Sequence, residues 1–454
     1  MTFTSINPAT GALLKTVQPW GESALEQCLR QVARAAPAWA AQPLAGRAAL
    51  LRQVATLLRT RQEALARLIT QEMGKLLAEA QAEIEKCAAG CEYYAEQGAQ
   101  FLAPEIIASD ATRSYVRYEP LGTVLAVMPW NFPFWQVFRC AAPALMAGNS
   151  VVLKHAANVP QCALAIEELF GAAGFPADVF RTLLIESQQV ERVIADPRVQ
   201  AVSVTGSIGA GRAVAAAAGG QLKKTVLELG GSDAFIVLDD ADLEVAVAQA
   251  VTARFLNAGQ SCIAAKRMIV VQGVADVFVQ GLKAAVERLR PGDPLAAATT
   301  LAPLARADLR DELHAQVSDS IAQGALAVTG CAPLPGPGNH YAPSLLDQVK
   351  PGMRAWHEEL FGPVACVLRA RDERDAVRIA NDSCFGLGGS VWTQDSARGE
   401  YIACALQCGA AFVNGIVKSD PRLPFGGIKQ SGYGRELSRH GLLEFVNIKT
   451  VWIK

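Results

Sequence analysis

The sequence predicts an α/β protein built on mostly parallel sheets, and three observations support this fold class. Apolar residues make up 51% of the 454 residues and charged residues 19%, a composition typical of a globular chain with a large core. From about residue 120 onward, short apolar runs alternate with longer amphipathic stretches, as in repeated βα units. A long helical segment precedes this alternation. At roughly 150 residues per unit, the length predicts about three structural units.

The first hundred residues have helical character. Ala, Leu, Glu, Gln and Arg dominate from residue 22 onward, and apolar residues recur three and four positions apart. This spacing predicts three helices, over Ala24–Ala40, Gly46–Met73 and Leu76–Phe101. The period then changes, and two strands are predicted at Ser114–Arg117 and Thr123–Met128, on either side of Gly122.

Strands and helices then alternate in the order expected for a parallel sheet with helices on both faces. Three predicted βα pairs are Ser150–Lys154 with Pro160–Ala173, Val179–Leu184 with Gln188–Ala195, and Ala201–Thr205 with Gly211–Ala218. A second set between Thr225 and Leu423 has predicted strands at Val270–Gln272, Cys366–Leu368 and Ala411–Asn414, and a proline- and glycine-rich loop at Cys331–Asn339. The tail Phe445–Ile453 is β-like again and is expected to pair with another element or another subunit.

The charge and the absence of targeting signals favour a small-molecule partner. The net charge of −1 gives no long-range field that would attract nucleic acid or an anionic membrane. The first ten residues lack the basic and apolar regions of a secretory signal. From Pro120 to Leu153 the only charge is Arg139, but four prolines interrupt this stretch, so it is expected to be buried protein structure rather than a membrane span.

The eleven cysteines do not follow the pattern of a disulfide framework. Their number is odd, they are scattered, and the chain has only five histidines, so reduced thiols in a cytoplasm and no metal site are expected. Two pairs, Cys87/Cys91 and Cys404/Cys408, have the i, i+4 spacing of a helix and are expected to face the core.

Two segments at predicted strand ends could serve either structure or chemistry. Residues 201–218 run from an apolar strand through Thr205-Gly206-Ser207 into a helix, which is either a phosphate site or an ordinary tight turn, since G-x-G-x-x-G is absent. Glu228 ends the next apolar run. Burial there would raise its pKa toward that of a general base, unless an unseen Lys or Arg pairs with it.

Two loop residues have the same ambiguity. Cys262 follows the loop Asn257–Gln260, where backbone N–H groups could stabilise a thiolate, but a free cysteine is more often a small buried hydrophobe. No histidine is close in sequence, which argues against a cysteine protease. Asn131, in the motif MPWNFP, either satisfies local backbone or points at a ligand.

Taken together and in order, the motifs resemble the aldehyde dehydrogenase superfamily over nearly the whole chain. They are INPATG (6–11), EMGK (72–75), MPWNFP (128–133), Lys154, TGS (205–207), ELGG (228–231), GQSC (259–262), ELFGP (359–363), PFGG (424–427) and SGYGREL (431–437). The segments KHAANV (154–159), ELGGSD (228–233) and SDPR (419–422) are similar to a short bacterial succinate-semialdehyde dehydrogenase subfamily.

The resemblance implies a role for each matching residue. Cys262 corresponds to the nucleophile, Glu228 to the general base and Asn131 to the oxyanion-hole amide. The implied cofactor-binding residues are Lys154, Trp130, Thr205, Gly206, Ser207, Gly211, Leu229, Glu359 and Phe361. The cofactor is NAD, with NADP possible. The thiolate would attack an aldehyde, hydride would leave to the nicotinamide, and Glu228 would activate water to hydrolyse the thioester.

A semialdehyde carries a distal carboxylate, so the resemblance requires a cation in the substrate pocket. Arg139 is the first candidate, with an internal ion pair as the alternative. Ser419 and Phe425 are further expected pocket residues, and Arg422 is a weaker cationic candidate. Better-known members carry a second arginine where this chain has Leu256, so broader aliphatic or aromatic aldehyde specificity stays open.

A second departure concerns the cofactor. Members strict for NAD often carry a glutamate three residues after the lysine, and this chain has Ala157 there, with His155 nearby, so NADP is not repelled. The resemblance also implies an NAD(P)-binding domain (1–102 and 121–229), a catalytic domain (230–436), and a β bridging domain (103–120 and 437–454) that joins a homodimer or homotetramer. A CoA-acylating enzyme, which would lack the glutamate base, and a non-catalytic paralogue, which would lack the cysteine, are the rival interpretations.

Overall fold

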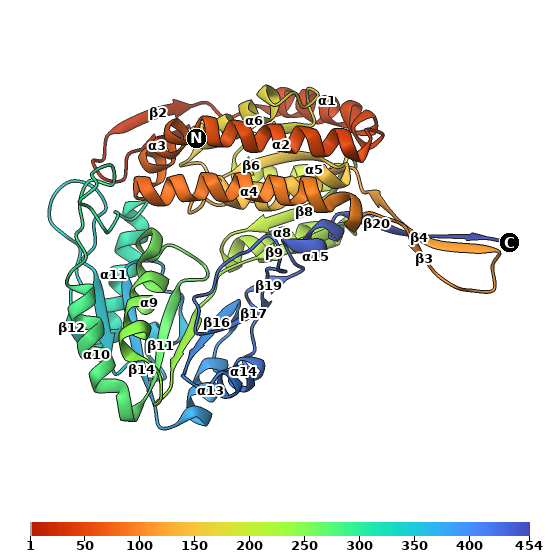
Figure 1. Ribbon diagram of the computed structural model, residues 1–454. Coiled ribbons are helices and arrows are strands. Elements are labelled where there is room, and N and C mark those ends of the chain that lie inside the picture. Colours follow the sequence, from red (N-terminus) through yellow and green to blue (C-terminus); the bar gives the residue numbers. More distant parts are fainter. Residues whose placement is uncertain (1) are drawn as a thin grey trace.

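The computed structural model describes residues 2–454 and contains two α/β lobes and a projecting β arm (Figure 1). The first lobe is built on a six-stranded sheet in the order β19-β9-β8-β5-β6-β7. Its strands are β5 (Thr123–Met128), β6 (Ser150–His155), β7 (Phe180–Thr182), β8 (Val199–Thr205), β9 (Lys224–Glu228) and β19 (Gly432–Tyr433). All neighbours in this sheet are parallel except β19, which pairs antiparallel with β9.

Helices cover both faces of this sheet, as the alternation of strands and helices predicts. Alternate residues of β5 enter different cores: Val124 and Ala126 pack on one face and Leu125 on the other. One face is covered by α5 (Trp135–Ala147) and α6 (Pro160–Ala172), and outside them lie α2 (Leu44–Thr60), α3 (Gln62–Met73) and α4 (Leu77–Phe101). The other face is covered by α1 (Glu22–Ala40), α7 (Val190–Ala195) and α8 (Ile208–Gly220). The hairpin of β1 (Phe3–Ile6) and β2 (Leu13–Val17) precedes them.

The predicted helices and strands of this lobe are found, with two main differences. The helix predicted over Gly46–Met73 is two helices, because Arg61 leaves helical geometry at φ −102° and ψ 11° and separates α2 from α3. The strand predicted at Val179–Leu184 is reduced to three residues. The apolar stretch from Pro120 to Leu153 is buried inside the lobe as β5, α5 and β6.

The second lobe contains a seven-stranded sheet in the order β12-β13-β14-β11-β10-β16-β17. Its strands are β10 (Asp233–Val237), β11 (Ala265–Val271), β12 (Leu326–Thr329), β13 (Ser344–Asp347), β14 (Val364–Ala370), β16 (Gly388–Trp392) and β17 (Ala410–Val413). The helices around it are α9 (Leu243–Phe255), α10 (Gln272–Val286), α11 (Ala307–Ala322), α12 (Arg354–His357), α13 (Glu373–Asn381) and α14 (Ser396–Ala405). The strand predicted at Val270–Gln272 is the end of β11, and Gln272 already begins α10.

The arm is a three-stranded antiparallel sheet formed by β3 (Glu105–Ile106), β4 (Arg113–Pro120) and β20 (Val446–Ile453). It extends away from the first lobe, with the C-terminus at its tip, and α15 (Ser438–Leu443) leads into it (Figure 1). The β-like tail predicted from the sequence therefore pairs along its whole length with β4. The side chains of Ile448, Trp452 and Ile453 on β20 are exposed.

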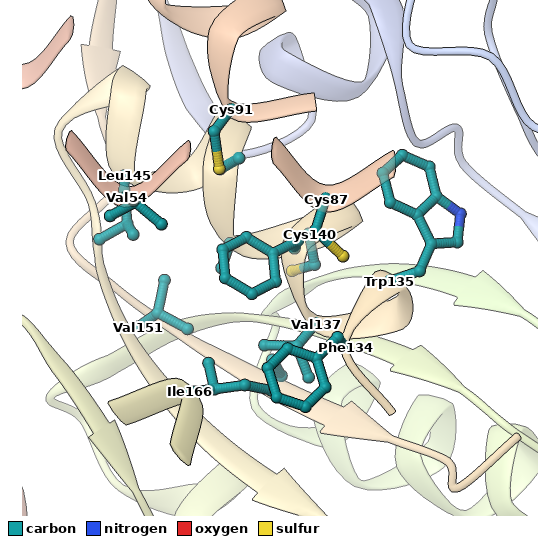
Figure 2. Close-up of a cluster of buried hydrophobic side chains, with 14 of the residues drawn as sticks. Val54, Cys87, Cys91, Phe134, Trp135, Val137, Cys140, Leu145, Val151 and Ile166 are labelled. Atoms are coloured by element: carbon teal, nitrogen blue, oxygen red, sulfur yellow. The ribbon is translucent and has the colours of Figure 1, made fainter. Parts of the chain in front are cut away.

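The cysteines are all free thiols with different surroundings. Cys87, Cys91 and Cys140 lie in the core beside Phe134 and Val137, so the prediction that the Cys87/Cys91 pair faces the core is confirmed (Figure 2). The same prediction is wrong for Cys404 and Cys408. Cys404 is exposed on α14, and this helix ends at Ala405, so Cys408 lies beyond it and the two do not share a helical face.

Residues 2–454 contain neither a membrane-spanning helix nor a cluster of metal ligands. None of their helices combines the length and the apolar character that crossing a bilayer requires. No cluster of three or more His, Cys, Asp or Glu side chains in this part of the chain is arranged to hold a metal ion.

Candidate active site

Cys262 lines two pockets that lie on either side of it, and Gln136 is the other residue common to both linings. The first, here called the strand-end pocket, has a volume of about 260 Å³ and lies where β5, β8 and β9 end. The second, here called the basic pocket, has a volume of about 120 Å³ and is lined by Lys86, Arg139 and Lys418. Among the described residues, the lining of the basic pocket includes no aspartate or glutamate.

The strand-end pocket gathers seven of the nine residues predicted to bind the cofactor. They come from four separate segments: Trp130; Thr205, Gly206 and Ser207; Leu229; and Glu359 with Phe361. The carboxyl ends of parallel strands are the usual site for a nucleotide in such sheets, because the helices that follow begin there. Asn131 lines the same pocket.

The turn after β8 leads into the capped N-terminus of α8. Ser207 is the N-cap of α8, and its Oγ accepts a hydrogen bond from the Ala210 N–H at 3.3 Å. Gly211 does not line the pocket, but a Cβ at this position would lie 2.5 Å from the Leu229 side chain. A glycine is therefore needed for α8 to approach the end of β9, where Leu229 borders the pocket.

Lys154 and His155, at the end of β6, have different environments. The Lys154 ammonium lies 3.4 Å from Ser187 Oγ, and burial lowers its pKa. His155 is buried, its Nε2 lies 2.8 Å from the Pro133 carbonyl, and burial lowers its pKa to about 4. The His155 ring therefore contacts the MPWNFP loop, and its burial favours the neutral form.

The loop before Cys262 has left-handed backbone geometry at three successive residues, Asn257, Ala258 and Gly259, with φ of 55°, 52° and 73°. The Asn257 amide holds this strained turn by donating to the carbonyls of Gln260 at 3.1 Å and Asn131 at 2.8 Å. Asn131 Nδ2 donates to the Gln260 carbonyl at 3.1 Å. The Asn131 amide thus contacts the backbone of the cysteine loop, 129 positions away in sequence, rather than local backbone, and the same residue also borders the pocket.

Two buried cations that the sequence reasoning missed position this loop. The Arg254 guanidinium donates to four carbonyls, of Gly259, Leu360, Gly362 and Val364, and so ties the cysteine loop to the segment that carries Glu359. Lys266 Nζ donates to the Ser261 and Cys262 carbonyls at 2.6 and 2.8 Å and lies 2.9 Å from Glu359 Oε1. A charged residue at the end of an apolar helix or strand is the sequence signal that could have pointed to both.

Burial disfavours the charged forms of both the predicted nucleophile and the predicted base. Burial raises the pKa of the Cys262 thiol to about 12, against the opposing effect of Arg139 and Lys266. Burial also holds the pKa of Glu228 well above its usual range, although Arg139 acts in the other direction. Neither carboxyl oxygen of Glu228 has a hydrogen-bond partner among residues 2–454, and a Cβ on Gly426 would lie 2.6 Å from one of them. Glu228 therefore lies next to the PFGG segment and outside the lining of both pockets.

Arg139 lies in the wall of the basic pocket, but its charge is already balanced. It forms a buried ion pair with Glu436, donates to Thr205 Oγ1 at 3.2 Å, and stacks 4.6 Å above the Phe425 ring. The internal ion pair, which the sequence left open as the alternative to carboxylate binding, is the arrangement found. Phe425 and Ser419 line the same pocket as expected, whereas Arg422 is exposed and pairs with Asp420.

The EMGK motif (72–75) does not line either pocket but holds the starts of α5 and α6, which follow the site loops. Glu72 accepts hydrogen bonds from the backbone N–H groups of Gln161 and Cys162 at the start of α6. Lys75 is ion-paired with Glu83, and its Nζ lies 3.7 Å above the Phe132 ring. Glu83 in turn accepts from the first N–H groups of α5, so the motif holds the loop that carries Asn131.

Comparison with known proteins gives consistent matches over the full length. Residues 1–451 match the aldehyde dehydrogenase family. A protein of Synechocystis named "Probable succinate-semialdehyde dehydrogenase [NADP(+)]" is 50% identical over 453 residues and covers 100% of both chains. The Escherichia coli succinate semialdehyde dehydrogenase described as using NAD(P)+ is 48% identical, with 99% of this chain and 97% of that protein covered. The crystal structure of succinic semialdehyde dehydrogenase from Streptococcus pyogenes with NADP+ superposes with a TM-score of 0.98 at 38% identity and 99% coverage of each chain. The chain therefore belongs to the aldehyde dehydrogenase family.

Proposed function

We propose that this enzyme oxidises succinate semialdehyde to succinate with NAD or NADP. The observation that carries the proposal is the position of Cys262 between two pockets, one at the strand ends and one basic. A nucleophile that forms a covalent adduct with an aldehyde and presents it to a cofactor must be accessible from both sides.

The residues of the strand-end pocket suit a dinucleotide. The capped N-terminus of α8 offers free N–H groups to a pyrophosphate, and Glu359 offers hydrogen bonds to ribose hydroxyls. Trp130 and Phe361, with ring centroids 5.9 Å apart, offer an aromatic wall. Lys154, near the end of β6 and outside the lining of this pocket, is proposed as a further donor to a ribose. Bound there, NAD(P)+ supplies the acceptor for the hydride. Ala157 leaves no carboxylate to repel a 2′-phosphate, which fits the NADP+ and NAD(P)+ named for the relatives.

Cys262 is proposed as the nucleophile. The thiol first loses its proton to solvent; the thiolate sulfur then forms a bond to the aldehyde carbon, and the carbonyl π electrons move to oxygen to give a thiohemiacetal alkoxide. The Asn131 amide and the Cys262 N–H are the proposed donors to this oxygen; loss of one such donor typically costs ~10²–10³ in rate. Oxidation of the adduct leaves a thioester on Cys262.

Glu228 is proposed as the base for hydrolysis of the thioester. Its carboxylate removes a proton from water, the water oxygen adds to the acyl carbon, and the carbon–sulfur bond breaks to release the acid and the thiolate. The high pKa of the buried carboxyl makes it a strong proton acceptor once ionised. A CoA-acylating enzyme would not need this group.

Kinetics with a panel of aldehydes, measured with NAD and NADP side by side, test the proposal. The highest kcat/KM is expected with succinate semialdehyde, and the product is expected to be the free acid. Cys262→Ala should abolish the oxidation, whereas Cys404→Ala, which removes an exposed cysteine on α14, should leave it unchanged. Formation of an acyl-CoA, or activity that survives Cys262→Ala, would contradict the proposal. Equal kcat/KM for all aldehydes would indicate a broad-specificity enzyme instead.

Three further features of the enzyme are part of the proposal. We assign cofactor binding to residues 1–102 and 121–229, catalysis to 230–436 and subunit bridging to 103–120 and 437–454. The exposed apolar residues of β20 support a homodimer or homotetramer formed through the arm, since an unpaired strand edge with such side chains favours pairing. The eleven unpaired cysteines are typical of a cytoplasmic enzyme.

A further inference from the structure

Lys86 places an ammonium group in the basic pocket together with Cys262. It projects from α4, its Nζ donates to Ser419 Oγ at 2.7 Å, and it lies 4.7 Å above the Trp135 ring. The side chain is half-buried, and it is the only lysine on α4.

No acid balances the charge of Lys86. Within residues 2–454 it has no carboxylate within ion-pair distance, and the acids around it are already engaged: Glu83 pairs with Lys75, and Asp420 pairs with Arg422. Arg139, the other buried cation of the pocket, is neutralised by Glu436. Burial, followed by repulsion from Arg139, lowers the pKa of Lys86 to about 8. Apart from Lys418, which is exposed at the rim, Lys86 is therefore the cation of this pocket whose charge an anionic ligand would balance.

Ser419 adds a hydrogen-bond donor to the same place. Its Oγ accepts from Lys86 Nζ and, at 3.0 Å, from Trp135 Nε1. A hydroxyl that accepts two hydrogen bonds has only its proton left to offer, and no acceptor for this proton is found in the described part of the chain. An ammonium and a hydroxyl proton side by side form a binding site for a carboxylate.

We propose that Lys86, together with Ser419, binds the distal carboxylate of the substrate and thereby determines specificity for ω-oxo acids over uncharged aldehydes. This inference rests on the proposed function. The resemblance to better-known members points to two other positions for this role, Arg139 and Leu256. In this structure Arg139 is paired with Glu436, and Leu256 carries no charge, so the role is assigned to Lys86. Lys86 does not take part in bond making; it positions the aldehyde carbon at the Cys262 sulfur.

The test compares succinate semialdehyde with two neutral analogues of the same chain length, butanal and methyl 4-oxobutanoate, in Lys86→Met, Lys86→Arg and the native enzyme. Loss of a charge-assisted contact should raise KM for succinate semialdehyde about 10–100-fold in Lys86→Met. The KM for both neutral aldehydes and the kcat for all three should change less than about threefold, since uncharged substrates do not use the contact. Lys86→Arg should recover part of the preference. Lys283→Met, on α10 and outside the pocket, is the matched control for a lysine-to-methionine change.

Each alternative outcome has a distinct signature. If Lys86→Met loses activity equally on all three aldehydes, Lys86 has a structural role. If Lys86→Met keeps the preference for succinate semialdehyde, the substrate does not contact Lys86. Either result overturns the inference. Loss of the preference in Lys418→Met instead would move the carboxylate site to the exposed rim of the pocket and would also overturn the inference.

If the native enzyme itself does not prefer succinate semialdehyde, the proposed function fails, whatever Lys86 does. A charge-reversed variant, Lys86→Glu, should shift the preference toward 4-aminobutanal, a result that a structural role would not produce.

Discussion

Arg139 and Glu436 form a buried ion pair in the wall of the basic pocket, and only 2% of each side chain is exposed. The pair joins α5 of the first lobe to the SGYGREL segment, and Ser203 Oγ also donates to Glu436 at 3.3 Å. A lone arginine in an apolar stretch looks like a ligand for substrate in the sequence. In the structure, a residue 297 positions later supplies its counter-charge.

The ion pair predicts a large stability effect from either partner alone. Arg139→Met or Glu436→Leu leaves one uncompensated buried charge, which typically costs about 3–5 kcal/mol, whereas the double variant should recover most of this loss. Urea-unfolding midpoints and thermal melts of the three variants measure the effect. Additive losses in the double variant would mean that the two side chains do not stabilise each other.

Glu228→Gln should separate the two halves of the reaction. The amide cannot accept a proton from water, so the first turnover should still produce a burst of reduced cofactor while steady turnover slows. Since burial raises the pKa of Glu228 well above its usual range, its base form is populated only at higher pH than that of an ordinary glutamate. Steady turnover limited by hydrolysis should therefore rise with pH in the native enzyme and lose this rise in the variant. Rapid-mixing absorbance measurements at several pH values test this prediction, and equal loss of burst and steady rate would contradict a role in hydrolysis.

The charge of Lys86 predicts a pH dependence of KM for one substrate class. The amine is protonated below its pKa of about 8, which desolvation and Arg139 lower while Cys87, Glu83 and Asp420 act to raise it. Carboxylate binding needs the protonated form, so KM for succinate semialdehyde should increase as pH rises through about 8 and above. KM for butanal should stay flat over the same range. A parallel rise for both aldehydes would assign the titration to a group of the shared chemistry, and Lys86→Arg should remove the dependence.

The sequence predicted most of the fold because its signals are local. Strand β5 has the predicted bounds of Thr123–Met128, and the strand–turn–helix around Ser207 lies where expected, since apolar runs and glycine turns carry this information directly. The split at Arg61 was not predicted, because a single residue leaves helical geometry without proline or glycine.

The charge pairing of the site could not be predicted from the sequence in the same way. The partners Arg139–Glu436, Lys75–Glu83 and Lys266–Glu359 are far apart in sequence or lack a fixed spacing, so only the fold brings them together. His155 shows the same limit, since its pKa is lowered mainly by burial inside the fold and only to a smaller extent by its neighbour Lys154. Lys86 was missed because one lysine among many glutamates on an amphipathic helix looks like part of a solvated face.

Gly211 offers a test of cofactor binding that is independent of the reacting groups. In an ordinary helix, a change from glycine to alanine is stabilising by about 1 kcal/mol. Here the added methyl group would lie 2.5 Å from two methyl carbons of Leu229, so either α8 or the end of β9 must move. Overpacking of this kind typically costs about 1–3 kcal/mol, and a displaced α8 should weaken NAD(P) binding about tenfold or more.

Gly209→Ala is the matched control on the same helix, because only Ser207 Oγ lies near its added methyl group, at 4.0 Å. The double variant Gly211→Ala/Leu229→Ala should regain most of the affinity, because it removes the carbons that the new methyl group meets. Titration of the cofactor by fluorescence or calorimetry, without any aldehyde, gives the dissociation constants directly. An unchanged constant in Gly211→Ala would show that the close approach of α8 to Leu229 does not shape the cofactor site.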